Sequence, residues 1–139
     1  MTPDALIRTW FKEVWNEGNE MSLDRIFASE GIAHNLPSAD DSSMKGPAAF
    51  KPFVRQFRTA FPDVHIEVLR TITEGPMVCA HCRVTGTHRG PGFGPAATGS
   101  AIDFSGMTIV RVENDRIVEA WNSFDFMSMF QQIQLLPKL

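Results

Sequence analysis

One carboxylate in this 139-residue sequence stands among bulky apolar neighbours. Asp125 follows Phe124 and precedes Phe126 and Met127. Poor hydration disfavours the charged form of a carboxyl group, so we expect the pKa of Asp125 to be raised toward the range useful to a general acid or base. The alternative is structural, because aspartate is a favoured N-cap and a short helix is expected to begin at the next residue. The two roles are compatible, and the sequence leaves both open.

A histidine is the second candidate for chemistry. His88 is expected at the end of a long strand, where its ring can donate a hydrogen bond to a substrate carbonyl or a developing enolate. The alternative is an ordinary solvated residue at a strand end. A metal site is not expected, because His81 and His88 are seven residues apart and face opposite sides of one strand. The sequence also lacks the His-x-His and His-x3-His pairs that converge on an ion.

The two cysteines, Cys79 and Cys82, form a C-x-x-C pair. Such a pair favours redox chemistry where it opens a helix, but this one lies inside a predicted strand. Positions three apart on a strand face opposite sides, so we predict two separate thiols. The glycine- and proline-rich stretch 90–95 is not a phosphate loop, because it leads into a strand rather than a helix. We interpret it as a lid over a pocket mouth, with Phe93 near the ligand.

Helical spacing of apolar residues predicts the elements that position these groups. A first helix is expected to be capped by Thr2 and ended by Gly18. Ser22 is expected to cap a second, shorter helix. A third helix is expected to follow Gly46 and to stop at Pro62.

Strand patterns dominate the second half of the chain, after a short extended segment over 31–36 and a polar loop over 38–45. A tight hairpin is expected at Asn114-Asp115, and a last helix over 126–135. The pattern predicts an α+β fold: a cone-like curved antiparallel sheet packed against three N-terminal helices, within a single domain over residues 1–139. The long strands are expected over 64–73, 77–88, 99–112 and 116–124.

Composition excludes some classes of partner. The net charge is -3 and the pI is near 5.8, so the chain lacks the clustered positive charge that nucleic acid or an anionic membrane requires. No stretch approaches the roughly 20 apolar residues of a membrane helix. Arg8, Lys12 and Glu13 interrupt any signal-peptide core, and we therefore expect a cytoplasmic protein.

Four short motifs stand out along the chain. They are Phe61-Pro62-Asp63, Gly86-Thr87-His88-Arg89-Gly90, Ala97-Thr98-Gly99 and Arg116-Ile117-Val118-Glu119-Ala120-Trp121, followed four residues later by Asp125. In this order and spacing they resemble the SnoaL-like polyketide cyclases of the wider superfamily with the nuclear transport factor 2-like fold. The resemblance covers nearly the whole chain. It implies the cone-like fold and is far less specific for a reaction.

The resemblance implies site residues. In polyketide cyclases of this family the matching aspartate is the acid/base of an intramolecular aldol closure, which implies that catalytic role for Asp125, with His88 beside it. Such a reaction requires no metal and no cofactor. His34 and Asn35 resemble the family's histidine on the first short strand, and this implies that they orient substrate near the pocket mouth.

Arg83 tests a rival activity. Limonene-epoxide-hydrolase relatives carry Arg-x-Asp on a strand, where this sequence reads Arg83-Val84-Thr85. The position of their second carboxylate is Ser123 here, so epoxide hydrolysis by that route is not expected. Arg83 either binds an anionic or carbonyl group inside the pocket or forms a surface ion pair.

An apolar pocket lined partly by aromatic residues favours ring-containing ligands. We predict that Phe57, Met107 and Trp121 line it. A semi-apolar outer sheet surface is expected to pair two subunits in a homodimer. Thr108, Val110 and Val112 make up the expected dimer surface. Most other aromatic residues are expected in the core, namely Trp10, Trp15, Phe50, Phe53 and Phe104.

Three functions remain compatible with the sequence. The first is a cofactor-independent acid/base enzyme, a cyclase, isomerase or dehydratase that acts on an apolar, ring-containing carbonyl compound. The second is a non-catalytic module that binds such a small molecule. The third is a dimerisation module whose pocket is filled by its own side chains.

Overall fold

The structure is a computed structural model that describes residues 1–37, 43–94 and 96–137. No described helix is long and apolar enough to cross a membrane. The helices are α1 (Pro3–Thr9), the π-helix η1 (Trp10–Asn16), α2 (Glu20–Ile26), α3 (Pro47–Ala60) and α4 (Phe126–Gln132). The strands are β1 (Phe27–His34), β2 (Met44–Lys45), β3 (His65–Glu74), β4 (Met77–Thr87), β5 (Ala101–Glu113) and β6 (Arg116–Phe124).

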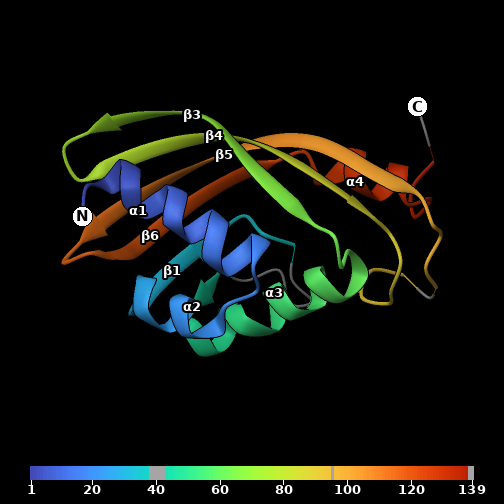
Figure 1. The fold of residues 1–139 in the computed structure, drawn as a ribbon, viewed down its shortest axis with the longest axis horizontal. Coiled ribbons are helices and arrows are strands. Elements are labelled where there is room, and N and C mark those ends of the chain that lie inside the picture. Colours follow the sequence, from blue (N-terminus) through green and yellow to red (C-terminus); the bar gives the residue numbers. More distant parts are fainter. Residues whose placement is uncertain (38–42, 95, 138–139) are drawn as a thin grey trace.

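The strands form one curved sheet in the order β2-β1-β6-β5-β4-β3. Strands β3 to β6 are antiparallel neighbours, whereas β1 runs parallel to β6. The sheet bends over α1, η1, α2 and α3, which lie on its concave side (Figure 1). Long strands twist and curl, and register shifts within the β3–β4 and β5–β6 pairs increase the bend. The predicted α+β fold with a cone-like sheet is confirmed.

The first helix has the predicted extent but changes its winding halfway. The Thr2 hydroxyl accepts a hydrogen bond from the Ala5 N–H at 3.1 Å, which confirms the predicted cap. From Trp10 onward the helix is a π-helix, with hydrogen bonds from residue i+5 to residue i. At its end the Glu17 N–H donates to the Lys12 carbonyl at 3.0 Å. Gly18 then ends the helix in the left-handed region, with φ of 68°.

The cap of α2 was predicted at the wrong residue. Asn19 is the cap, and its side chain accepts a hydrogen bond from the Ser22 N–H at 3.1 Å. Ser22 is buried inside the first turn, where its hydroxyl donates to Glu13 at 2.6 Å. Asparagine and serine are about equally favoured as N-cap residues, so the sequence pattern alone does not separate Asn19 from Ser22.

The helix α3 supplies the floor beneath the sheet, as its spacing predicts. It begins at Pro47, directly after Gly46, and ends at Ala60, two residues before Pro62. Residues at i, i+3 and i+7 share one face of a helix, and here that face carries phenylalanines. Those that are buried are Phe50, Phe53 and Phe57.

Two strand predictions need correction. The predicted segment 31–36 is part of a longer strand, β1, which begins at Phe27 directly after α2. The polar loop predicted over 38–45 ends in β2, whose Met44 pairs with Ala33; residues 38–42 lie outside the described part of the chain. The hairpin at Asn114 and Asp115 is as predicted, since both residues have positive φ, 52° and 59°.

Asp125 begins α4. Its carboxylate accepts hydrogen bonds from the Ser128 N–H at 3.1 Å and from the Ser128 hydroxyl at 2.7 Å. These bonds to the charged form, the side-chain bond first, lower the pKa of Asp125 and outweigh the opposing effect of burial. The cap that the sequence offered as an alternative role is therefore present.

Removing this cap should destabilise the protein. We expect Asp125→Ala to lower the free energy of unfolding at pH 7 by about 1 kcal/mol, while Asp125→Asn loses less because asparagine also caps. Because the folded pKa is lowered, the carboxylate's contribution is complete above its unfolded pKa and is lost as pH falls through the folded value. Denaturant titrations at pH 7 and at pH 3 should therefore show a smaller difference between wild type and Asp125→Asn at pH 3. Equal stability of all three proteins at pH 7 would contradict this role.

Candidate functional site

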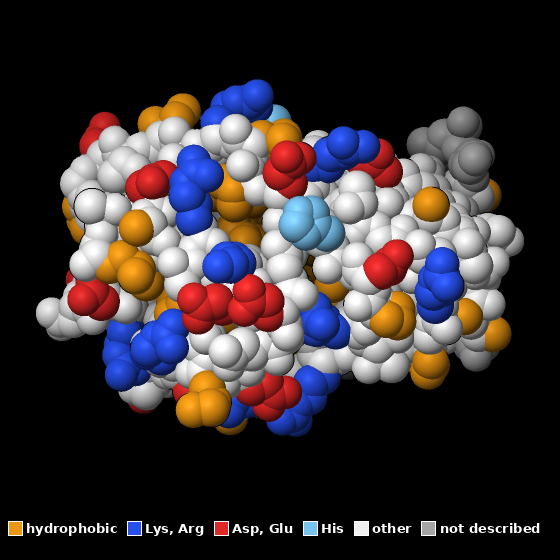
Figure 2. Space-filling model, viewed as in Figure 1, with side chains coloured by type: hydrophobic (Ala, Val, Ile, Leu, Met, Phe, Trp, Pro, Cys, Tyr) orange, Lys and Arg blue, Asp and Glu red, His pale blue; other side chains and the backbone are white. Residues whose placement is uncertain are grey.

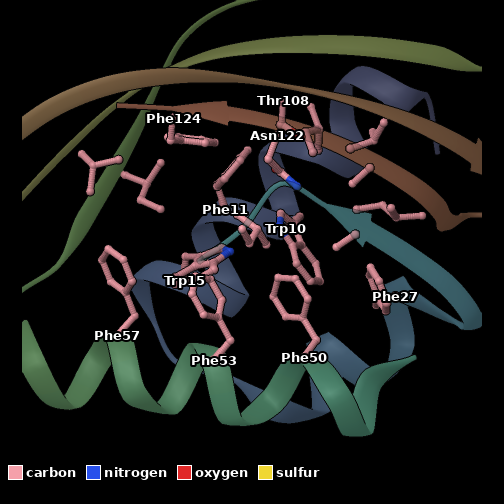
Figure 3. Close-up of a pocket in the computed structure, with 18 of the residues that line it drawn as sticks. Trp10, Phe11, Trp15, Phe27, Phe50, Phe53, Phe57, Thr108, Asn122 and Phe124 are labelled. Carbon is pink, nitrogen blue, oxygen red and sulfur yellow. The ribbon is translucent and has the colours of Figure 1, made fainter. Parts of the chain in front are cut away.

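An aromatic pocket occupies the space between the concave face of the sheet and the helices (Figure 3). In the space-filling view, hydrophobic side chains lie in a hollow between charged ones (Figure 2). The pocket is narrow. Its cavity volume is about 50 Å³, and the unfilled space is about 580 Å³ when the open mouth is included. Ten of the twenty lining residues are aromatic, namely Trp10, Phe11, Trp15, Phe27, Phe50, Phe53, Phe57, Phe104, Phe124 and Phe126.

The remaining lining residues are mostly aliphatic, and the polar exceptions are few. Thr108 and Asn122 face each other across β5 and β6 and are the pair of polar side chains that project from the sheet into the pocket. The Asn122 amide donates to the His34 carbonyl at 2.9 Å, and this fixes its orientation. None of the described lining residues carries an ionisable side chain. The described part of the pocket wall therefore supplies no side-chain acid or base.

The aromatic side chains pack edge to face, which holds the pocket walls in place. Trp15 contacts three phenylalanines of α3, Phe50, Phe53 and Phe57, with ring centroids 5.5 to 6.1 Å apart and near-perpendicular planes. Trp10 contacts Phe50 in the same manner at 5.3 Å. Such contacts are the preferred geometry of aromatic pairs, so these rings form a stable wall.

Asp125 does not lie in this pocket. Its side chain is exposed and borders a groove on the opposite, outer face of the sheet, beside His81 and Met107. The prediction of an apolar setting with a raised pKa is wrong, because the neighbouring Phe124 and Phe126 turn into the pocket while the residue between them turns outward. A catalytic role for Asp125 stays a prediction that its position does not support.

His88 is buried, with 1% of its surface exposed, but it stands behind the pocket. Its ring packs on Phe61 at 5.4 Å, and Phe61 packs on Phe57 of the pocket wall at 5.1 Å. The Thr98 N–H donates to Nδ1 at 3.2 Å, so the proton of the neutral ring is on Nε2. Nε2 is enclosed and has no hydrogen-bond partner among the described residues. The prediction that His88 faces a substrate is therefore not met in this arrangement.

His34 and Asn35 are also outside the pocket. The His34 ring lies on the outer face, where Nε2 contacts the Glu119 carboxylate at 2.7 Å and Nδ1 contacts the Ser43 hydroxyl at 2.8 Å. Trp121 stacks on it with centroids 6.0 Å apart. Asn35 is exposed just after β1, with φ of 64°. Neither side chain lines the pocket, because Ala33, one residue earlier, is the residue that faces inward. Their role in orienting substrate near the pocket mouth stays a prediction.

Three further predicted binding residues face outward. Arg83 is exposed and pairs with Asp103 at 2.6 Å, which is the surface ion pair that the sequence offered as an alternative. Met107 and Trp121 are exposed on the outer face, because their strand neighbours Thr108 and Asn122 take the inward positions. The prediction that Met107 and Trp121 line the pocket is therefore wrong.

Phe57 and Phe93 lie at one end of the pocket. Phe57 lines it, as expected for a binding residue, and its contact with a substrate stays a prediction. Phe93, from the predicted lid, is buried against Phe57, Phe61 and Phe130, with centroids 5.4 to 6.1 Å apart. It closes this end of the aromatic cluster without lining the pocket itself.

The thiols take no part in the site. Cys82 is buried, and burial raises its pKa to about 12, so it remains protonated. Cys79 is half-buried on the other side of β4, in line with the prediction of separate thiols. Among the described residues no three His, Cys, Asp or Glu side chains gather as metal ligands would.

The sequence analysis missed the residues that give the pocket its polarity. Trp10 and Trp15 were expected in the core because their helical spacing matches a buried face, yet both line the cavity. Thr108 was placed on the outer face, and Asn122 was not considered. Strand alternation counted back from the half-buried, pocket-lining Phe124 places Asn122 inside, since residues two apart share a face.

Solved structures share this fold. A protein from Jannaschia sp. CCS1 assigned as a SnoaL-like polyketide cyclase matches with a TM-score of 0.85 at 18% identity, over 97% of this chain and 93% of its own. IdmH, assigned as a polyketide cyclase of Streptomyces antibioticus, matches with a TM-score of 0.83 at 23% identity, over 95% and 98%. A protein from Acidithiobacillus ferrooxidans with the same assignment has a TM-score of 0.81 at 26% identity, over 96% and 94%.

A search of curated proteins found no match. A family model, in contrast, covers almost the whole chain: the SnoaL-like polyketide cyclase model matches residues 5–133. The matched segment includes every described residue that lines the pocket. The resemblance drawn from the short motifs is confirmed, and the chain belongs to the SnoaL-like polyketide cyclase family.

Proposed function

We propose that this protein binds an apolar, ring-containing carbonyl compound in the aromatic pocket and promotes its cyclisation or isomerisation. The observation that carries the proposal is the pocket itself, in which half of the lining residues are aromatic and the few polar groups sit together. Flat rings pack well between aromatic side chains, and isolated polar groups fix a ligand's orientation. Membership of the family supports a cyclase- or isomerase-like function.

The reaction proposed here does not depend on a side-chain base in the pocket. The described lining residues supply hydrogen-bonding groups but no carboxylate, imidazole, amine or thiol. Such a pocket can promote ring closure of the ligand's enol form by holding the reacting carbons close together and by polarising the carbonyl through hydrogen bonds. The α-carbon of the enol then bonds to the carbonyl carbon, and the enol's hydroxyl proton passes to the carbonyl oxygen, which becomes the product's hydroxyl. This mechanism replaces the acid/base role that the sequence suggested for Asp125.

The same lack of an ionisable side chain favours a second candidate, a non-catalytic carrier of the same ligand. The two functions differ in whether the bound compound changes. A naphthyl-substituted 1,5-diketone, whose intramolecular aldol closure gives an isomeric ring ketol, separates them by chromatography and mass spectrometry. Faster closure with the protein supports the cyclase, and binding with no acceleration supports the carrier.

We also propose a homodimer that pairs the outer faces of two sheets. Exposed Met107, Ile109 and Trp121 form an apolar patch there, since Ile109 lies opposite Trp121 across β5 and β6. An apolar patch of this kind suits an isologous contact. The surface predicted from the sequence was the wrong one: Thr108, Val110 and Val112 are buried on the inner face.

Filling the pocket should weaken binding. We expect Ala120→Leu, which adds bulk inside the pocket, to weaken binding of 2-acetylnaphthalene by about tenfold or more, because overpacking costs about 1–3 kcal/mol. Quenching of tryptophan fluorescence measures the affinity. Ser123→Leu adds similar bulk to the outer face of the same strand and should leave binding unchanged. Unaltered affinity in a folded Ala120→Leu protein would place the ligand elsewhere.

A charge in the outer patch should separate the subunits. We expect Ile109→Glu to be a monomer in size-exclusion chromatography with light scattering at concentrations where wild type is a dimer, because a buried, unpaired carboxylate is costly. Met21→Glu is the control, since Met21 is an exposed apolar residue on α2. A monomeric wild type, or a dimer that persists in Ile109→Glu, would refute the proposed interface.

A further inference from the structure

We propose that the indole N–H groups of Trp10 and Trp15 act together as the binding site for the ligand's oxygen, a carbonyl or enolate. The inference rests on the proposed function, in which a ring-containing carbonyl compound occupies the pocket. It assigns the polar end of that compound to two donors on the π-helix η1.

Both indoles are buried, and each carries one N–H donor. Trp10 and Trp15 are 5% and 6% exposed, and both line the pocket. Among the described residues, the enclosed side-chain atom without a hydrogen-bond partner is His88 Nε2. Neither indole nitrogen is therefore enclosed without a partner there, which agrees with indoles that border the pocket. Figure 3 shows both turned toward the middle of the pocket, on the side of Asn122.

The π-helix explains how one helix presents two such donors. In an α-helix a residue lies above the one four positions earlier, and a residue five positions on is turned away. In a π-helix the hydrogen bonds run from i+5 to i, so Trp15 lies above Trp10 and both project from one face. Single π-turns are rare and occur often at functional sites.

Contacts at the end of η1 hold this widened turn. The Asn16 side chain donates to the Ile66 carbonyl at 3.0 Å and accepts from the Ile66 N–H at 2.7 Å, which ties the helix to β3. The Arg58 guanidinium of α3 donates to the Asn16 carbonyl at 3.1 Å. The phenylalanines of α3 fix the two indole rings from below. The donors are therefore positioned before a ligand arrives.

The other two polar side chains of the pocket each donate one hydrogen bond to the backbone. The Asn122 amide donates to the His34 carbonyl at 2.9 Å, and the Thr108 hydroxyl points to the Trp121 carbonyl at 3.4 Å. Two N–H donors in an aromatic pocket favour an oxygen that carries negative charge, because hydrogen bonds are stronger where a bound ligand has displaced water from apolar surroundings. They would stabilise an enolate oxygen more than a neutral carbonyl.

Nuclear magnetic resonance of the indole N–H groups tests the proposal on the wild-type protein. The chain has three tryptophans, and Trp121 lies on the outer face as an internal control. We expect 2-acetylnaphthalene to move the indole proton signals of Trp10 and Trp15 downfield and to leave that of Trp121 in place. 2-Ethylnaphthalene, which has the same shape but no acceptor, should bind without the downfield shift.

Affinities of the same two compounds give an independent readout. We expect Trp10→Phe and Trp15→Phe each to reduce the preference for 2-acetylnaphthalene over 2-ethylnaphthalene by about threefold to tenfold, while Trp121→Phe preserves it. The ratio cancels any general change in pocket shape. If both compounds bind but the ratio and the indole signals do not respond, the donor assignment is overturned and the binding function stands. If neither compound binds, the proposed function itself fails.

Discussion

Strand alternation in the curved sheet is the constraint on which this protein depends. Every second residue of β4, β5 and β6 faces the helices, and this inner set includes Val84, Phe104, Thr108 and Asn122. The outward set carries the charges, among them the Arg83–Asp103 pair and Glu119. Because a shift by one residue exchanges the two sets, the same register places apolar side chains of these strands in the pocket and their charged side chains outside it.

Much of the fold follows from the sequence, because helical and alternating patterns are local. The three N-terminal helices, the long strands and the Asn114-Asp115 hairpin lie close to where the patterns put them. The site was harder, because the face of a strand residue depends on register and bulges. Trp121 is the neighbour of Asn122, which does line the pocket. The motif around Trp121 does not indicate which of the two side chains faces inward. The large apolar side chains next to Asp125 in the sequence suggested that it is buried. In the structure Phe124 and Phe126 turn into the pocket, and the Asp125 side chain is exposed.

The π-helix could not be predicted from the sequence either, because the spacing of Trp10 and Trp15 also fits the buried face of an α-helix. Its last residue, Asn16, contacts distant partners, the backbone of Ile66 and the side chain of Arg58. Both tryptophans line the cavity. The chemistry that we propose for the pocket is that of enclosure and hydrogen bonding, whereas the family resemblance alone suggested proton transfer by a carboxylate. The protein shares its fold with solved structures, but the chemistry of its site has to be inferred from the residues of this chain.

A crystal structure of the complex with 2-acetylnaphthalene tests the central claim most directly. The account predicts the rings between the phenylalanines of α3 and the inner face of the sheet, with the ketone oxygen within hydrogen-bond distance of the Trp10 and Trp15 indole nitrogens. A ligand bound instead in the outer groove beside Asp125 and His81, with the aromatic pocket closed, would contradict it.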